Sequence, residues 1–241
     1  MMNRWFTRYL FGLENGVEKD SKAWIVREND SQQNPTPYEA YPNPDASLVS
    51  LHLHPGAPEL GELLLKKNKI KKLETLTDDF NYDGVTLAKA KFSENRLLFL
   101  SPILKEDIHI SGVSNLNIKV ASSKKAVNLS VWLVSLPWNS EKNAKITDNI
   151  ITRGWADIQN YKSIRESKDL IPGKFYQMSF NLEPDDQVIK KGQQIGLMIF
   201  SSDSEFTLHP KPGTTLTVDI NASSLELPVV GGNKSLKRAF K

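Results

Sequence analysis

Alternation between apolar and polar residues is the clearest pattern in the chain, and it is strongest within residues 93–136. Apolar residues occupy every second position in 116–120 and again in 127–133. A period of two places these side chains on one face of a β-strand. Because a short polar turn at 122–125 separates the two runs, the sequence predicts a β-hairpin with one buried face.

Further strands are predicted wherever the same period recurs between turns rich in proline and glycine. They cover residues 48–54, 146–155, 176–182, 214–220 and 224–230, and a strand that is apolar on both faces covers 195–200. Residues 59–77 are an exception, because clustered leucines with neighbouring lysines indicate a helix. This arrangement is typical of a mainly β fold, a jelly-roll or galactose-binding-like β-sandwich.

The first segment has a different period, which predicts an amphipathic helix over Met1–Leu13. Asn15 and Gly16 then form a typical helix stop. A helix this short is marginal alone in water, so its apolar face needs a surface to dock on. We expect this face to be a domain interface that stays incompletely buried in the isolated chain. The candidate interface residues are Trp5, Phe6, Tyr9, Leu10 and Leu13.

Proline marks a domain boundary after this segment. Residues 23–27 predict a short strand, and the prolines of residues 29–46 favour an extended linker. We therefore divide the chain into the tail of an α/β domain (1–28), a Pro-rich linker (29–46), a β-sandwich domain (47–230) and a basic tail (231–241). The tail is expected to be disordered, and the lysines of 66–72 to form a solvated helix face.

The composition of the chain argues against several classes of function. Of the 241 residues, 39% are hydrophobic and 24% are charged, and 31 basic against 28 acidic residues leave a net charge of +3. That balance gives no sign of nucleic-acid or membrane binding. The absence of cysteine excludes disulfides, thiolate nucleophiles and cysteine-based metal sites. Arg4 and Arg8 interrupt the first apolar stretch, so we predict no signal peptide and expect a cytoplasmic protein without a cofactor.

The sequence lacks the catalytic motif of a serine hydrolase. Gly112 and Ser114 begin a G-x-S-x-G nucleophile elbow, but Leu116 stands where the second glycine belongs. His109 lies in a predicted strand and His209 in a loop, and neither has a Ser or Asp context typical of a catalytic histidine. We therefore predict no catalytic residue in this chain.

A metal site is the next possibility, at two histidines that share a strand face. His52 and His54 are two residues apart, a spacing that suits a metal if Glu59 or Glu62 supplies a third ligand. Two polar residues on the solvent face of an edge strand explain the spacing more simply. We predict no metal ligand here.

Two pairs of adjacent acidic residues and one pair of glycines do not indicate a catalytic or phosphate-binding site. Asp78-Asp79 and Asp185-Asp186 are typical of turns, and adjacent acids on a strand diverge too far for a glycosidase pair. Gly231-Gly232 has no predicted helix after it that would form a phosphate site.

Tryptophans offer the alternative function, a carbohydrate-binding jelly-roll module. Trp132 lies opposite the apolar row of its strand, where its ring is predicted to face solvent and to stack on a sugar. Burial under a loop or against another domain is the commoner fate of tryptophan. The candidate sugar platform comprises Trp132, Trp138 and Trp155.

The order of strands and turns resembles a known domain. The segments that carry the resemblance are Leu97–Gly112, Ala126–Leu136, Thr152–Asn160, Leu170–Leu182 and Ile189–Asp203. The last of them ends in Ser-Ser-Asp. In this order the segments resemble the C-terminal β-sandwich of the X-prolyl dipeptidyl aminopeptidases, which is shared with cocaine esterase and related acyl hydrolases of the α/β-hydrolase type.

The resemblance implies a non-catalytic role. In that family a Ser–Asp–His triad removes X-Pro dipeptides from peptide N-termini, and a helix follows the catalytic histidine. Met1–Leu13 corresponds to that helix, so the chain is expected to begin just after the last catalytic residue. The resemblance implies that the chain is inactive alone, partners the catalytic α/β-hydrolase domain, and meets proline-containing peptides only through that domain. A homodimer is possible in the parent enzyme.

Overall fold

A computed structural model describes residues 2–27, 34–208 and 213–241. Met1, residues 29–33 of the expected linker, and His209 lie outside the described residues. The helices are α1 (Met2–Phe11), α2 (Gly84–Lys89) and α3 (Gly232–Ala239), with 3-10 turns η1 (Val17–Lys19), η2 (Ile146–Asn149), η3 (Ile158–Asn160) and η4 (Ile220–Ala222). The strands are β1 (Ala23–Ile25), β2 (Thr36–Tyr38), β3 (Ala46–His54), β4 (Gly61–Leu64), β5 (Leu73–Thr77), β6 (Arg96–Leu100), β7 (Ile108–Gly112), β8 (Asn115–Ser122), β9 (Asn128–Leu136), β10 (Ile150–Asp157), β11 (Phe175–Asn181), β12 (Asp185–Ile189), β13 (Gln194–Phe200), β14 (Thr215–Asp219) and β15 (Ser224–Val230).

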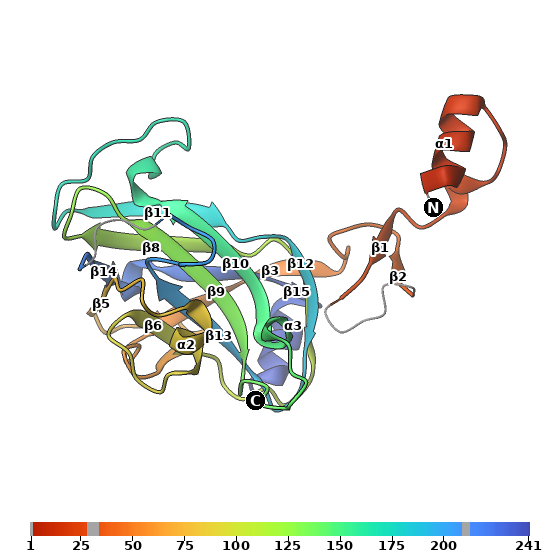
Figure 1. Ribbon diagram of the computed structural model, residues 1–241. Coiled ribbons are helices and arrows are strands. Elements are labelled where there is room, and N and C mark those ends of the chain that lie inside the picture. The colour runs from red at the N-terminus through yellow and green to blue at the C-terminus, as the bar shows by residue number, and fades with distance from the viewer. Residues whose placement is uncertain (1, 28–33, 209–212) are drawn as a thin grey trace.

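Two groups of strands build a β-sandwich, which confirms the predicted mainly β fold (Figure 1). One layer consists of β10, β9, β13 and β6, paired in that order. The other is built around β15, which pairs with β3, β7 and β8, while β8 also pairs with β11 and β14. β4 links the two groups, because it pairs in parallel with β6 and antiparallel with β3.

The hydrophobic core lies between these two groups. Val131 of β9 and Ile199 of β13 enter it from one layer, and Ile118 of β8 and Leu225 of β15 enter it from the other. Every second residue of a strand points inward, and the inward residues of both layers are apolar. This explains the alternation in the sequence. The predicted strands at 23–27, 48–54, 146–155, 176–182, 195–200, 214–220 and 224–230 correspond to β1, β3, β10, β11, β13, β14 and β15.

β8 and β9 do not pair with each other, so the predicted hairpin is wrong although both of its strands are present. β8 pairs with β11, β14 and β15, whereas β9 pairs with β10 and β13. The connection at residues 123–127 carries the chain from one layer to the other. Alternation indicates only that one face of each strand is buried. A hairpin and a crossover between layers bury the same positions, so the pattern does not distinguish them.

Residues 59–77 contain two strands, β4 and β5, and the predicted helix is wrong. Leu63 and Leu76 enter the core from these strands. Glu74 is also buried, because its carboxylate accepts hydrogen bonds from the backbone N–H groups of Gly56 at 2.7 Å and Ala57 at 3.0 Å. Pairing with β3, β6 and β14 therefore overrides the helical propensity of the leucines and lysines.

A second apolar layer covers the outer face of β9 and β13. α2 begins after Asp83, whose carboxylate accepts a hydrogen bond from the N–H of Thr86 at 2.6 Å. Its Leu87 packs in a cluster with Trp132 and Phe200. β9 is therefore buried on both faces.

The C-terminal residues form α3, and the expected disordered tail is wrong. Leu236 and Ala239 are buried against β3, β7 and β15, while Lys234 and Lys237 face outward. The helix starts directly after Gly231, contrary to the expectation that no helix follows the glycine pair. In the part of the chain that the structure describes, no helix is long and apolar enough to cross a bilayer.

Candidate functional site

Helix α1 lies at the end of an N-terminal arm, which we define as α1, β1, β2 and the described residues between them (Figure 1). The apolar face of this helix is exposed. None of the residues of α1 is buried. Trp5, Phe6 and Tyr9 are 49%, 45% and 54% exposed, and Leu10 and Leu13 are exposed as well. The Trp5 ring packs on the other two rings, with centroids 5.5 Å and 4.8 Å away. The prediction that these aromatics stay incompletely buried is confirmed.

The opposite side of α1 is held by the chain that follows it. Arg4 forms an ion pair with Asp20 at 2.8 Å, and Arg8 forms one with Glu18. An amphipathic helix usually turns its apolar face toward the core of its own domain. Here the polar side makes the intrachain contacts and the apolar side is open to solvent.

Within the described residues, a cluster of polar side chains joins the arm to the sandwich. We call Arg27, Tyr38, His109 and Asp186 the junction. Asp186 is only 6% exposed, and its Oδ1 accepts hydrogen bonds from Arg27 Nε at 2.7 Å and His109 Nε2 at 2.9 Å. The hydroxyl of Tyr38 accepts a hydrogen bond from Arg27 and lies 3.5 Å from His109 Nε2. Arg27 and Tyr38 belong to the arm, and His109 and Asp186 to the paired strands β7 and β12.

Charge stabilises the junction at neutral pH. Burial alone would raise the pKa of Asp186, but the hydrogen bond from His109 and the positive charge of Arg27 outweigh burial, so this pKa lies below its usual range. Burial and the nearby Asp186 raise the pKa of Tyr38, which keeps its phenol neutral. The expectation that Asp185-Asp186 form a turn is wrong, because these residues open β12 and pair with β7.

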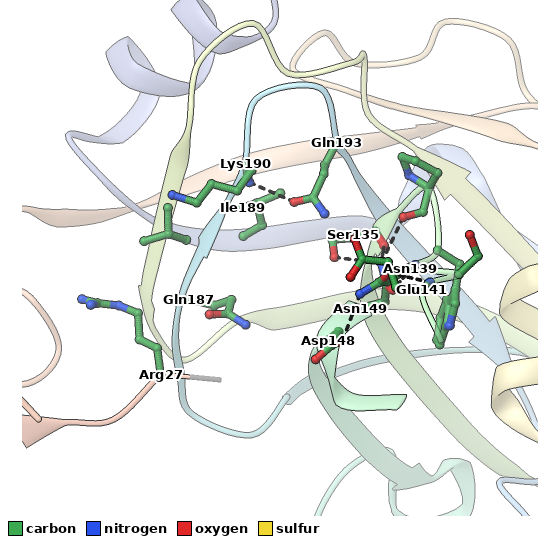
Figure 2. Close-up of a pocket in the computed structure, with 14 residues that line it drawn as sticks. Arg27, Ser135, Asn139, Glu141, Asp148, Asn149, Gln187, Ile189, Lys190 and Gln193 are labelled. Atoms are coloured by element: carbon green, nitrogen blue, oxygen red, sulfur yellow. Dashed lines mark hydrogen bonds between the residues drawn. The ribbon is translucent and has the colours of Figure 1, made fainter. Parts of the chain in front are cut away.

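A polar cleft of about 940 Å³ opens beside the junction (Figure 2). Arg27, Gln187 and Lys190 border it on the side of β12, and Asn139 and Asp148 border it on the side of the connection between β9 and β10. Asn139 donates a hydrogen bond to Asp148 Oδ2 at 3.1 Å, which orders that wall. The lining offers hydrogen-bonding groups and charges of both signs, and it includes no histidine that would activate a nucleophile.

The three candidate sugar-binding tryptophans do not form a platform. Trp132 is 1% exposed beneath α2, so its predicted solvent-facing ring is wrong. Its indole N–H and that of Trp155 both donate to Asp203 Oδ2, at 2.9 Å and 3.0 Å. Trp138 borders the cleft instead, with the ammonium of Lys89 5.3 Å from its ring centroid. Asp203 thus binds the indole N–H groups of the buried Trp132 and the partly buried Trp155, and nothing supports the carbohydrate-binding alternative.

His52 and His54 lie on β3 without the ligand set of a metal site. His54 Nε2 is hydrogen-bonded to the backbone carbonyl of Lys66 at 2.8 Å. Burial and the charge of Lys67 lower the pKa of His52, which favours the neutral imidazole. Glu59 and Glu62 do not complete a site, since the described residues hold no group of three or more His, Cys, Asp or Glu arranged for a metal ion.

Of the residues weighed for catalysis, Ser114, His109 and Asp78 are engaged in structural contacts or buried. Ser114, the serine of the incomplete elbow, is 1% exposed between β7 and β8. His109 is bonded to Asp186 within the junction. Asp78 is buried, where its carboxylate accepts hydrogen bonds from Ser202.

Sequence reasoning missed Arg27, Tyr38 and Asp203. Arg27 and Tyr38 come together only because β1 and β2 pair, and nothing in the intervening residues signals that pairing. Asp203 is the last residue of the Ser-Ser-Asp segment that contributed to the family resemblance, but no role was predicted for it. Its contact with two indoles depends on β9 lying between β10 and β13, which local sequence does not reveal.

Known sequences identify relatives over nearly the whole chain. A family model described as "X-Pro dipeptidyl-peptidase C-terminal non-catalytic domain" matches residues 15–236. A putative Xaa-Pro dipeptidyl-peptidase from Rhodopirellula baltica is 57% identical over 237 residues, which are 98% of this chain and 38% of that protein. Another from Bacillus anthracis is 35% identical over 235 residues, which are 95% of this chain and 36% of that protein. The chain thus spans less than two fifths of the length of these relatives.

Solved structures share the fold. An aminopeptidase from a marine sediment Thaumarchaeota archaeon superposes with a TM-score of 0.71 at 13% identity, over 95% of this chain and 44% of that one. A CocE/NonD family hydrolase from Staphylococcus aureus gives 0.68 at 12% identity, over 95% of this chain and 45% of that one. At these identities the similarity shows the β-sandwich fold alone.

Proposed function

Because the chain belongs to the family of X-Pro dipeptidyl-peptidase C-terminal non-catalytic domains, we propose that it serves a cytoplasmic serine peptidase that removes X-Pro dipeptides from peptide N-termini. An α/β-hydrolase domain catalyses the peptidase reaction. The relatives are long enough to contain such a domain in addition to the part that this chain matches. The sandwich stabilises that domain and helps to shape access to its site. It meets proline-containing peptides only as part of the whole enzyme.

The observation that carries this proposal is the exposed aromatic face of α1. The helix precedes residue 15, where the match to the non-catalytic domain begins. Fully burying a large apolar side chain contributes about 1.5–3 kcal/mol. Trp5, Phe6 and Tyr9 are each about half exposed, so their docking on a hydrolase domain releases a substantial part of that free energy.

The first experiment tests inactivity. The purified chain is incubated with glycyl-prolyl-p-nitroanilide, and the release of p-nitroaniline is followed by absorbance. We expect release at the rate of the buffer blank, because the chain has no elbow nucleophile. A rate above the blank that copurifies with the chain contradicts the non-catalytic role.

The second experiment tests docking. The probe is the N-terminal part of the Rhodopirellula baltica relative, which this chain does not cover, and binding is measured by isothermal titration calorimetry. We expect binding by the wild-type chain and a loss of about ten-fold or more in affinity for the double variant Trp5→Ser/Tyr9→Ser. The matched control is Ile164→Ser, which removes an apolar side chain that is 91% exposed on the sandwich. Equal affinity of the double variant and the control contradicts docking through α1.

A further inference from the structure

One wall of the polar cleft contains a carboxylate oxygen that is buried and, among the described residues, has no hydrogen-bond partner. This oxygen is Oδ1 of Asp148. Its neighbour Oδ2 accepts hydrogen bonds from the backbone N–H of Lys145 at 2.9 Å and from the side-chain amide of Asn139 at 3.1 Å. Because a buried acceptor without a donor costs free energy, an N–H group that binds at Oδ1 gains stabilisation.

The cations that border the cleft are already paired with other carboxylates. Lys190 Nζ lies 3.0 Å from Asp107 Oδ2. Arg27 Nε lies 2.7 Å from Asp186 Oδ1. Glu141, which lies in the same connection between β9 and β10 as the buried oxygen, adds a second carboxylate to the lining. This wall of the cleft therefore carries negative charge and attracts a cation.

We propose that the cleft binds the N-terminal end of a short peptide, whose primary ammonium group donates a hydrogen bond to Asp148 Oδ1. Only this one oxygen of the carboxylate is available, because Oδ2 already has two donors. A compact ammonium group fits a single oxygen, whereas a planar guanidinium group pairs best with both oxygens of a carboxylate. A metal ion is a poorer match, since the described residues hold no group of three or more His, Cys, Asp or Glu arranged for one.

The remaining lining of the cleft suits the peptide groups behind such an ammonium. Figure 2 shows Gln187 on the β12 side of the cleft and Asp148 on the other side. Gln187, Asn139 and Ser140 bring amides and a hydroxyl to the lining. These groups form hydrogen bonds with peptide N–H and C=O groups, but an alkyl chain offers them no partner. The volume of about 940 Å³ admits several residues of a peptide as well as its ammonium group.

Nuclear magnetic resonance of the full chain at neutral pH tests this site. The probe is triglycine amide, which has an α-ammonium group and no carboxylate, and the matched probe is N-acetyl-triglycine amide, which has no ammonium group. The indole N–H of Trp138, which borders the cleft, reports binding after its signal is assigned with Trp138→Phe. We expect the uncapped peptide to bind about ten-fold or more tightly than the capped one. n-Butylamine should bind more weakly than triglycine amide, and tighter binding of butylamine would contradict a peptide as the occupant.

Two variants locate the binding at the buried oxygen. Asp148→Asn keeps an oxygen for Lys145 and Asn139 but removes the charge, so the affinity for triglycine amide should fall about ten-fold or more. The matched control Glu166→Gln neutralises an exposed carboxylate that is paired with Lys168 outside the lining of the cleft, and it should bind as the wild type does.

The proposal is overturned by the absence of binding, by equal affinities of the wild type for the capped and uncapped peptides, or by wild-type affinity in a folded Asp148→Asn protein. The comparison of the two peptides needs no variant, so it decides the question even where Asp148→Asn fails to fold. Binding is measured on the chain alone, so the result is independent of the proposed peptidase role.

Discussion

Arg96 is fully buried in β6 and offers a sharp test of how the sandwich is held together. Its guanidinium donates to the backbone carbonyls of Ala57 at 2.6 Å, Pro58 at 2.9 Å and Ala90 at 2.7 Å, and more weakly to Leu87 at 3.4 Å. These carbonyls belong to the loop after β3 and to the C-terminal end of α2. One side chain thus joins two segments that have no strand pairing with each other.

Replacing Arg96 with methionine keeps most of the length and removes every donor. The three short bonds to a charged group contribute about 1.5–3 kcal/mol each, and their loss leaves buried carbonyls without partners. Burial lowers the pKa of Arg96 to about 10, which corresponds to roughly 3 kcal/mol of desolvation cost that methionine does not carry. The difference predicts that Arg96→Met lowers the free energy of unfolding by about 2–5 kcal/mol.

The measurement is urea unfolding followed by circular dichroism, with the slope of the transition used to check that the unfolded surface is unchanged. The control is Arg238→Met, since Arg238 is an exposed arginine of α3 paired with Glu106, and we expect a change within about 0.5 kcal/mol. Replacing a buried ion by an apolar side chain is sometimes stabilising. An Arg96→Met protein at least as stable as wild type would therefore refute the reasoning, since it would show that desolvation outweighs the carbonyl contacts.

Three further variants test other contacts. Gly84→Ala places a methyl group against the buried ring of Trp132, and we expect a loss of about 1–3 kcal/mol in thermal unfolding despite the better helix propensity of alanine. Trp155→Phe keeps an aromatic ring but removes the N–H that bonds to Asp203, so a loss of about 1.5–3 kcal/mol is expected by urea unfolding. Because folding lowers the pKa of Asp186, this carboxylate stabilises the folded state at pH values above its unfolded-state pKa. That stabilisation is lost as the pH falls through its folded-state pKa. Between about pH 5 and pH 2 the wild type should therefore lose more stability than Asp186→Asn, and parallel losses would contradict this.

Strand positions were predictable from the sequence because burial of one face imposes a period of two on each strand. Ile118 and Val131 show this, since both enter the same core from strands that the alternation located. Which strands pair was not predictable, because β8 and β9 carry the pattern of a hairpin and nevertheless lie in different layers. The order of segments along the chain, compared with a known family, identified the fold where periodicity alone gave only its class.

Predictions about single side chains failed where a distant segment covers them. Trp132 has a solvent-facing position by alternation, and only the packing of α2 across β9 buries it. The face of α1 was predictable for the opposite reason. Its aromatics exceed what a short helix can bury on its own, so the exposure of Trp5 and Tyr9 could be predicted without any knowledge of the tertiary structure.

The position of β15 has a consequence for the synthesis of this domain. It is the last strand of the chain, yet it lies between β3 and β8 in the interior of the sheet. Ser50 and Glu226 are 176 positions apart and still form a hydrogen bond of 2.8 Å. Pairing over such separations forms slowly and late. During translation, the edges of β3 and β8 that pair with β15 stay unpaired until β15 has left the ribosome. We therefore expect chains truncated before β15 to aggregate instead of folding.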